Sequence, residues 1–205
     1  MSSRDVNSQD GVGSQGGSED RPAATPSSGF AGKLAFWLPW PFLVVLDLWS
    51  KAVAFGFLER EYGFALEPHR HHEVFDLGWL RFSLVSWGNP GTIWGLFPDG
   101  TVPLMVLRCG AIFGLLWFVR RTASTARLQL VVLSLIFAGA LGNLYDNFMR
   151  ADRTVRDFLH FQGTWPWQWD FPAFNVADSC ITVGAISLFL LLWREDRAAG
   201  KPAVS

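Results

Sequence analysis

The sequence predicts an all-α membrane protein, a four-transmembrane-helix bundle with a small extracytoplasmic β element in its first outer loop. Half of the 205 residues are hydrophobic and only 17% are charged, whereas charged residues make up about 25% of soluble domains. The apolar residues gather in four long runs, and a helix needs about 20 such residues to cross a bilayer. One short loop between two runs carries arginines and no acid, which is typical of the cytoplasmic face.

The segments outside the runs set the domain limits. Residues 1–32 are rich in Ser, Gly, Asp and Pro, a composition too poor in apolar side chains to fold, so they are predicted to form a disordered tail. This tail also lacks the n-region and h-region of a cleavable signal peptide. Residues 33–195 then form one membrane domain, and residues 196–205 form a short cytoplasmic tail. The formal charge of −1 provides no basic stripe for nucleic acid.

The first predicted span, about 34–58, contains the charged residues Asp47 and Lys51. They are four residues apart, so they share one helix face and can form an ion pair. Pairing makes both charges tolerable in a membrane, and it is also compatible with a support role beside a functional site. The second span, about 102–119, contains Arg108, which we expect to snorkel to the membrane surface.

The third predicted span, about 128–149, has no charge before its end. Gly139 and Gly142 lie on this helix, and small residues let helices approach closely. Asn143 and Asp146 then follow on a shared face. A carboxylate is unfavourable near a helix C-terminus because the helix dipole is negative there. We therefore expect Asp146 to have a donor partner.

The fourth predicted span, about 174–193, opens with Asn175 and Asp178. The two cysteines fall inside predicted spans, and they are interpreted as small buried residues rather than as a disulfide or metal pair. The loop between the second and third spans carries three arginines and no acid, so it is predicted to be cytoplasmic. Four spans then place both termini in the cytoplasm. The cysteines are Cys109 and Cys180, and the arginines of the loop are Arg120, Arg121 and Arg127.

The two outer loops are predicted to carry different features. Short stretches of β-branched and aromatic residues within 74–87 favour a small sheet. The segment 150–172 contains Trp165, Trp167 and Trp169, which is typical of an aromatic belt at a membrane interface.

Two acids carry the functional hypothesis. A carboxylate inside a membrane span is costly, which makes Asp178 a candidate functional residue. Asp157 lies 21 residues earlier, in the outer loop, and two acids at one membrane face suggest an aspartic hydrolase. Each has a simpler interpretation: a solvated loop acid for Asp157, and a helix N-terminal acid favoured by the dipole for Asp178. The histidines around His72 lack the order of a catalytic metal site, so no metal is expected.

Five segments, in order, resemble signal peptidase II, the bacterial lipoprotein signal peptidase. They span about residues 34–193. The segments are Asp47-Leu48-Trp49-Ser50-Lys51, Asn89-x-Gly91-x-x-Trp94-Gly95, Gly139-x-x-Gly142-Asn143-Leu144-x-Asp146, Val155-x-Asp157-Phe158 and Phe174-Asn175-x-Ala177-Asp178.

The resemblance implies a monomeric aspartic endopeptidase of the bacterial inner membrane, with its active site near the extracytoplasmic face. Such an enzyme removes the signal peptide from diacylglyceryl-modified prolipoproteins, on the amino side of the lipidated Cys, and it needs no cofactor. Its partners would be that substrate, membrane lipid and a globomycin-type inhibitor. The resemblance maps the catalytic pair onto Asp157 and Asp178. It maps the binding and supporting positions onto Asn89, Gly91, Asn143, Asp146, Asn175, Asp47 and Lys51.

One position departs from the family pattern. The family usually has Arg directly after the acid at position 146, and this chain has Asn147. Arg150 and Arg153 are the nearby candidates to replace that arginine. The departure leaves open a catalytically impaired relative that binds lipoproteins. A transporter or proton relay is the other alternative, because acids in membranes also form relays.

Overall fold

The computed structural model describes residues 29, 32–63, 71–90 and 101–199. Four helical stretches in this part of the chain are long and apolar enough to cross a membrane. The first stretch breaks near Leu38, where Pro39 has no backbone N–H to donate to a preceding turn. The helices are α1 (Leu34–Trp37), α2 (Pro39–Tyr62), α3 (Thr101–Arg121), α4 (Arg127–Met149) and α5 (Val176–Ala199).

Helix α4 forms the centre of the bundle. In the 18-residue apolar stretch of α4, 56% of the residues are buried, against 11% in the corresponding stretch of α3 and 17% in that of α5. It packs against α2, α3 and α5. The core around it includes Phe36, Leu133 and Phe137, all nearly inaccessible. Many large apolar side chains of α3 and α5 are exposed, among them Leu107, Phe113 and Phe189. This suits helices surrounded by lipid.

A four-stranded antiparallel sheet completes the fold, in the order β1-β2-β3-β4. The predicted β element in the first loop is confirmed by its first two strands. The sheet is larger than predicted, however, because the second loop contributes two strands where the sequence indicated only an aromatic belt. The strands are β1 (His71–Asp76), β2 (Leu80–Asn89), β3 (Val155–Gly163) and β4 (Trp169–Phe174).

A row of phenylalanine rings crosses the sheet from strand to strand. The ring centroids of Phe75 and Phe82 are 5.5 Å apart, those of Phe82 and Phe161 are 4.7 Å apart, and those of Phe161 and Phe174 are 6.0 Å apart. Aromatic pairs on neighbouring strands stabilise pairing beyond the area that they bury. This row therefore helps to fix β3 beside β2, which no local sequence signal requires.

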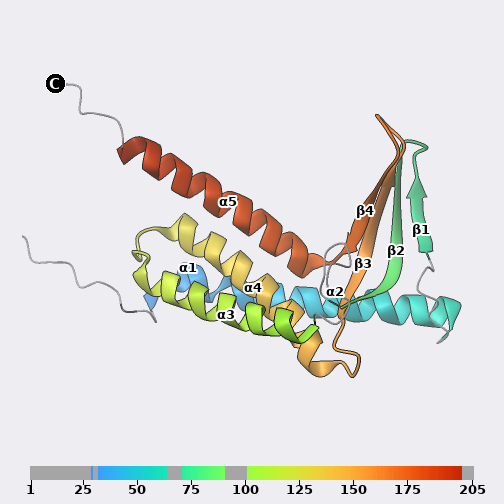
Figure 1. The fold of residues 1–205 in the computed structure, drawn as a ribbon, viewed down its shortest axis with the longest axis horizontal. Helices are drawn as coiled ribbons and strands as arrows, with labels where there is room; N and C mark the ends of the chain where they lie inside the picture. Colours follow the sequence, from blue (N-terminus) through green and yellow to red (C-terminus); the bar gives the residue numbers. More distant parts are fainter. Residues whose placement is uncertain (1–28, 30–31, 64–70, 91–100, 200–205) are drawn as a thin grey trace, which may run out of the picture.

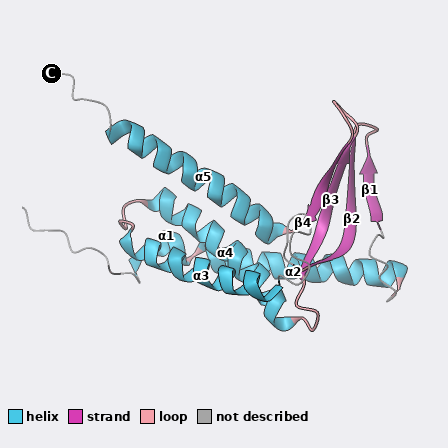
Figure 2. Ribbon diagram, viewed as in Figure 1, coloured by secondary structure: helices cyan, strands magenta, loops and turns pink. Residues whose placement is uncertain are grey.

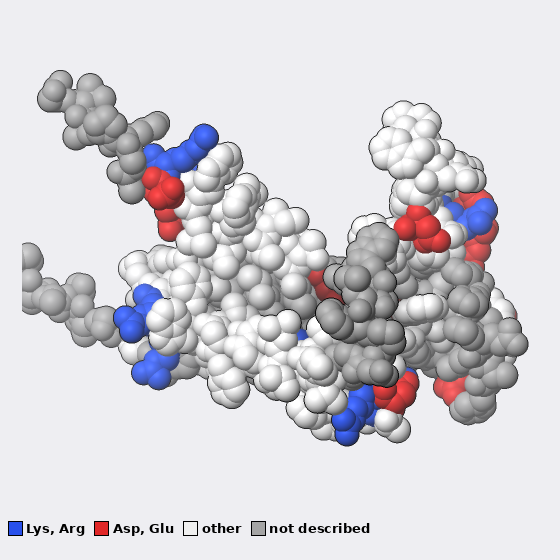
Figure 3. Space-filling model, viewed as in Figure 1, with Lys and Arg blue, Asp and Glu red and all other residues white. Residues whose placement is uncertain are grey.

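The sheet stands across one end of the helix bundle, as Figures 1 and 2 show. The start of α5 lies beside it, and α2 contacts both β2 and β3. Helix α1 and the C-terminal end of α5 lie at the opposite end. In Figure 3, charged side chains gather at the two ends, and a largely uncharged belt separates them. This distribution fits a bundle that crosses a membrane, with the sheet at one membrane surface.

Candidate active site

The first turn of α5 positions Asp178. The backbone N–H of Asp178 donates to Oδ1 of Asn175 at 2.9 Å, and the backbone N–H of Asn175 donates to Oδ2 of Asp178 at 3.2 Å. This reciprocal pair is a capping box, which satisfies N–H groups that a helix start leaves without partners. The carboxylate also lies at the positive end of the helix dipole, where negative charge is stabilised.

The second acid, Asp157, comes from strand β3 and faces the same point. Its Oδ1 accepts a hydrogen bond from Nδ2 of Asn175 at 2.6 Å, and its Oδ2 accepts one from Nδ2 of Asn89 at 2.9 Å. An irregularity in the β2–β3 register falls between Leu84 and Trp87, and Trp87 is the partner of Asp157. Bulges often re-aim side chains next to active sites. Asn175 thus bonds to both acids, and the two carboxyl groups are brought together.

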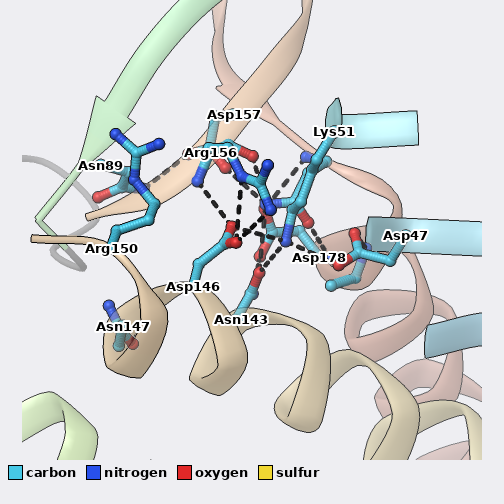
Figure 4. Close-up of polar contacts among 12 residues, drawn as sticks. Asp47, Lys51, Asn89, Asn143, Asp146, Asn147, Arg150, Arg156, Asp157 and Asp178 are labelled. Carbon is cyan, nitrogen blue, oxygen red and sulfur yellow. Dashed lines mark hydrogen bonds and ion pairs between the residues drawn. The ribbon is translucent and has the colours of Figure 1, made fainter. Parts of the chain in front are cut away.

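Asn143 of α4 links this pair to the helix bundle, as Figure 4 shows. Its Nδ2 donates to Oδ1 of Asp178 at 2.7 Å. Its Oδ1 accepts from Nζ of Lys51 at 3.1 Å and from Nδ2 of Asn175 at 3.2 Å. The amide has 1% of its surface exposed, so its orientation is fixed by these contacts. Three amides predicted from the sequence to lie near the acids all contact them in the structure: Asn89, Asn143 and Asn175.

A buried ion cluster lies directly behind Asn143. Nζ of Lys51 is 2.7 Å from Oδ2 of Asp47 and 3.2 Å from Oδ2 of Asp146, and none of the three side chains is more than 2% exposed. The pairing expected for Asp47 and Lys51 is confirmed. Asp47 has a second role, because its Oδ1 accepts the backbone N–H of Ala177 at 2.8 Å. One carboxylate therefore neutralises the lysine and caps α5.

The donor partner expected for Asp146 is also present. Arg156 donates to Oδ1 of Asp146 from Nη2 at 2.6 Å and from Nε at 3.1 Å, and its backbone N–H donates to Oδ2 at 3.0 Å. Lys51 is the second partner. No sequence signal identified Arg156 as this partner, although it directly precedes Asp157. Its contact with Asp146 holds the start of β3 against the end of α4.

The environment of Asp157 favours its protonated form. The side chain is fully buried, and loss of solvation, followed by repulsion from Asp178, raises the pKa of Asp157 to about 7. Hydrogen bonds from Asn89 and Asn175 and the charge of Lys51 oppose this rise. Asp178 differs in exposure, because it is only partly buried. One carboxyl group of the pair is therefore sealed from solvent, and the other is not fully buried.

The arginine that contacts Asn147 is not one of the two suggested by the sequence. Arg150 pairs with Asp152 at 2.7 Å, and Arg153 offers its backbone carbonyl to Nδ2 of Asn147 at 2.6 Å, so neither guanidinium bonds to Asn147. Arg108 is the arginine that bonds to this side chain, since its Nη1 donates to Oδ1 of Asn147. Snorkelling of Arg108 to the membrane surface stays a prediction, and this contact gives the guanidinium a partner inside the protein as well.

Four other residues named in the sequence analysis have no part in the contacts described above or cannot be placed. Gly91 falls outside the described residues. Nδ1 of His72 hydrogen-bonds to the hydroxyl of Tyr62 at 2.8 Å, and its ring packs edge-on against Phe57. Cys109 and Cys180 are free thiols; Cys180 is buried, as expected, whereas Cys109 is only partly buried, contrary to the expectation for both.

A cavity of about 440 Å³ lies at the far tip of the sheet. It is lined by residues from both hairpins, among them Trp79, Arg81 and Trp169. Asp157 lies near the opposite end of β3, because it pairs with Trp87 whereas Gly163 pairs with Trp169. The cavity is thus separate from the carboxylate pair.

Comparisons with known proteins agree with the fold. The family model described as Signal peptidase (SPase) II matches residues 41–194. A lipoprotein signal peptidase of Chlamydia trachomatis serovar L2 is 36% identical over 126 residues, covering 60% of this chain and 72% of that protein. One from Halalkalibacterium halodurans is 32% identical over 162 residues, covering 78% and 92%. A solved bacterial membrane enzyme has a TM-score of 0.61 at 24% identity, covering 85% of this chain and 94% of that one.

Proposed function

This chain belongs to the signal peptidase II family and is a hydrolase that acts as a signal peptidase, and from this we propose that it cleaves diacylglyceryl-modified prolipoproteins on the amino side of the lipidated Cys. The single observation that carries the proposal is the pair Asp157 and Asp178, joined through Asn175. Two carboxyl groups that share one proton and one water are the equipment of an aspartic peptidase.

The proposed mechanism divides the work between the two acids. Asp178 is the base that removes a proton from the attacking water, because it is partly exposed and lies at a helix N-terminus that stabilises its charge. Asp157 carries the shared proton and donates a hydrogen bond to the scissile carbonyl. As the tetrahedral intermediate collapses, the pair supplies a proton to the leaving amine.

The neighbouring amides hold these acids ready for reaction. Asn175 fixes both carboxyl groups with its side chain and backbone, and Asn143 and Asn89 each fix one. Groups held in place before reaction do not have to reorganise during it, which lowers the barrier. Lys51 and Asp47 support the amides from behind and do not contact the substrate in this proposal.

The arrangement of the ends supports a specific orientation. The short connection between α3 and α4 carries Arg120, Arg121 and Arg127, and α5 ends near Arg194 and Arg197. By the positive-inside rule this end lies in the cytoplasm. The sheet and the carboxylates then lie at the extracytoplasmic face of the bacterial inner membrane. A lipid-anchored substrate would deliver its scissile bond at that depth.

The proton-relay alternative fits the structure less well. A relay needs ionisable groups at successive depths across the membrane. The acids that face the site, Asp47, Asp146, Asp157 and Asp178, instead gather at the sheet end of the bundle. The side chains of Lys51, Asn143 and Asn175 link these acids into one local network, which suits chemistry at a single site.

The test is a processing assay with purified protein in lipid. A diacylglyceryl-modified precursor and the same precursor without lipid are incubated with the wild type, Asp157→Asn and Asp178→Asn. We expect cleavage of the lipidated precursor by the wild type alone, and block of that cleavage by a globomycin-type cyclic peptide. Equal cleavage of both precursors would refute the proposed requirement for a lipid-modified substrate. Cleavage by either variant at the wild-type rate would refute the catalytic role of the two acids.

A further inference from the structure

We propose that Arg108 is the counter-charge of the carboxylate pair, holding Asp157 and Asp178 at one net negative charge. This inference rests on the proposed function, and it assigns a positioning role to a residue on α3 that touches neither acid directly.

Arg108 lies in an unusual position for a charged side chain. It lies on a helix that is long and apolar enough to cross a membrane, where an arginine is costly unless it serves a charge partner. Within the described part of the chain, its hydrogen-bond partner is the neutral side chain of Asn147. A neutral amide orients a guanidinium but does not balance its charge. The compensating charge therefore has to come from groups beyond direct contact.

The carboxylates of the site provide that charge. The guanidinium of Arg108 is within electrostatic reach of three carboxylates, those of Asp178, Asp157 and Asp146. Asp146 already has two cationic partners, Lys51 at 3.2 Å and Arg156 at 2.6 Å. The unbalanced negative charge that Arg108 faces is consequently that of the catalytic pair.

A count of the charged groups around the pair gives the same answer. Lys51 and Arg156 balance the two acids that they contact, Asp47 and Asp146. The catalytic pair with one shared proton then carries a single negative charge, and Arg108 carries a single positive charge. The whole group is neutral in that protonation state alone. The groups facing the pair, by element, are Asp47 and Lys51 of α2, Arg108 of α3, Asp146 of α4, Arg156 and Asp157 of β3, and Asp178 of α5.

Asn147 fixes Arg108 in this position. The amide is 1% exposed, and its Nδ2 donates to the backbone carbonyl of Arg153 at 2.6 Å, which leaves its Oδ1 facing α3. Because the side chains at positions 108 and 147 touch, exchanging them keeps a guanidinium and an amide in contact at the same site. The exchange separates the position of the charge from the identity of the helix that supplies it.

The electrostatic consequence has a definite sign. A nearby cation favours ionisation of carboxyl groups, so it lowers both proton-binding steps of the pair. Removing the cation moves the acidic and the alkaline limbs of the pH profile to higher pH. At protein-like screening, one charge several ångströms away shifts each limb by about one pH unit. Activity on the acidic side falls about tenfold, while activity on the alkaline side rises relative to the optimum.

The experiment measures kcat/KM for the lipidated precursor from pH 5 to 9, per amount of folded protein judged by size-exclusion chromatography. The variants are Arg108→Gln, Arg108→Lys and the exchange Arg108→Asn with Asn147→Arg. Arg120→Gln, at the other end of the same helix, is the matched control. We expect both limbs of Arg108→Gln to move up by about one pH unit. We expect Arg108→Lys, the exchange and the control to keep the wild-type limbs.

Two outcomes overturn the inference. The first is a pH profile of kcat/KM for Arg108→Gln that superimposes on the wild-type profile after scaling. Arg108 would then stabilise the fold without setting the charge of the pair. The second is an exchange variant that is folded but retains the shifted limbs of Arg108→Gln. Asp157→Asn is run beside them: if it still cuts, the proposed function fails. If it is inactive while Arg108→Gln keeps the wild-type limbs, the role of Arg108 alone fails.

Discussion

Replacing Asp157 by Asn is expected to make the protein more stable at neutral pH while abolishing its activity. The acid is fully buried, and burial together with repulsion from Asp178 raises the pKa of Asp157 from 3.8 to about 7. A carboxyl group with a raised pKa in the folded state binds its proton more tightly there than in the unfolded chain. Folding stability therefore falls as pH rises from about 4 to about 7, and the loss is complete above that range.

The size of the effect follows from the shift. About 3 pH units correspond to about 4 kcal/mol of destabilisation above pH 7, an upper bound for the wild type. An asparagine escapes this penalty because it does not ionise. It can accept only one of the two N–H groups that Asn89 and Asn175 direct at Asp157, which costs about 1–2 kcal/mol. The net gain above pH 7 is then about 2 kcal/mol, and little gain remains at pH 5.

The assay is thermal unfolding of the wild type and Asp157→Asn in the same detergent at pH 5 and pH 8. At this chain length, about 2 kcal/mol corresponds to a melting temperature higher by roughly 4–8 °C. We expect that increase at pH 8 and a much smaller difference at pH 5. A variant that melts below the wild type by the same amount at both pH values would refute the reasoning.

Three further predictions follow from the same contacts. Cleavage by the wild type should decline above about pH 7, because Asp157 then loses the shared proton; a rate that stays constant to pH 9 would argue against this. Lys51→Met should lower stability by about 3–5 kcal/mol in urea unfolding, since it leaves buried Asp47 without its cation, and unchanged stability would contradict the ion cluster. Gly142→Ala should lower both stability and activity, because the added Cβ would lie 2.5 Å from Oδ2 of Asp47; full activity would show that the carboxylate can move away freely.

The four membrane helices were predictable from sequence because each depends on a local property. A run of about 20 apolar residues is visible without knowledge of its neighbours. The contact between Asp47 and Lys51 was predictable for the same reason, since a spacing of four residues places both on one helix face. The donor partner of Asp146 was predictable in kind, from the helix dipole, but its identity as Arg156 was not.

The second half of the sheet was not predictable in the same way. Strand β3 pairs with β2 across about 70 residues of sequence, so Leu84 lies opposite Leu159 with no local signal for the contact. Trp165, Trp167 and Trp169 were interpreted only as an interfacial belt. Trp165 and Trp167 do lie exposed on the turn, but Trp169 begins β4. Aromatic residues are common both at membrane interfaces and in β-strands, so the amino-acid composition of this segment does not distinguish the two.

The site divides along the same line. Asn175 and Asp178 are three residues apart, so their capping contact is local, whereas their approach to Asp157 depends on how β3 docks. Arg108 reaches Asn147 only because α3 packs against α4. Contacts between separate elements carry no spacing rule in the sequence. The catalytic and binding roles of these residues stay predictions that the variants above will test.

Single-turnover cleavage of a diacylglyceryl-modified precursor by wild type, Asp157→Asn and Asp178→Asn tests the central claim most directly. Each reaction is run with enzyme in excess, and binding of the same precursor is measured separately. We expect each variant to bind the precursor with near wild-type affinity and to cut it at least about a thousandfold more slowly, because each lacks one half of the proton-sharing pair. Wild-type cleavage by either variant would contradict the claim that these two acids act together on one water.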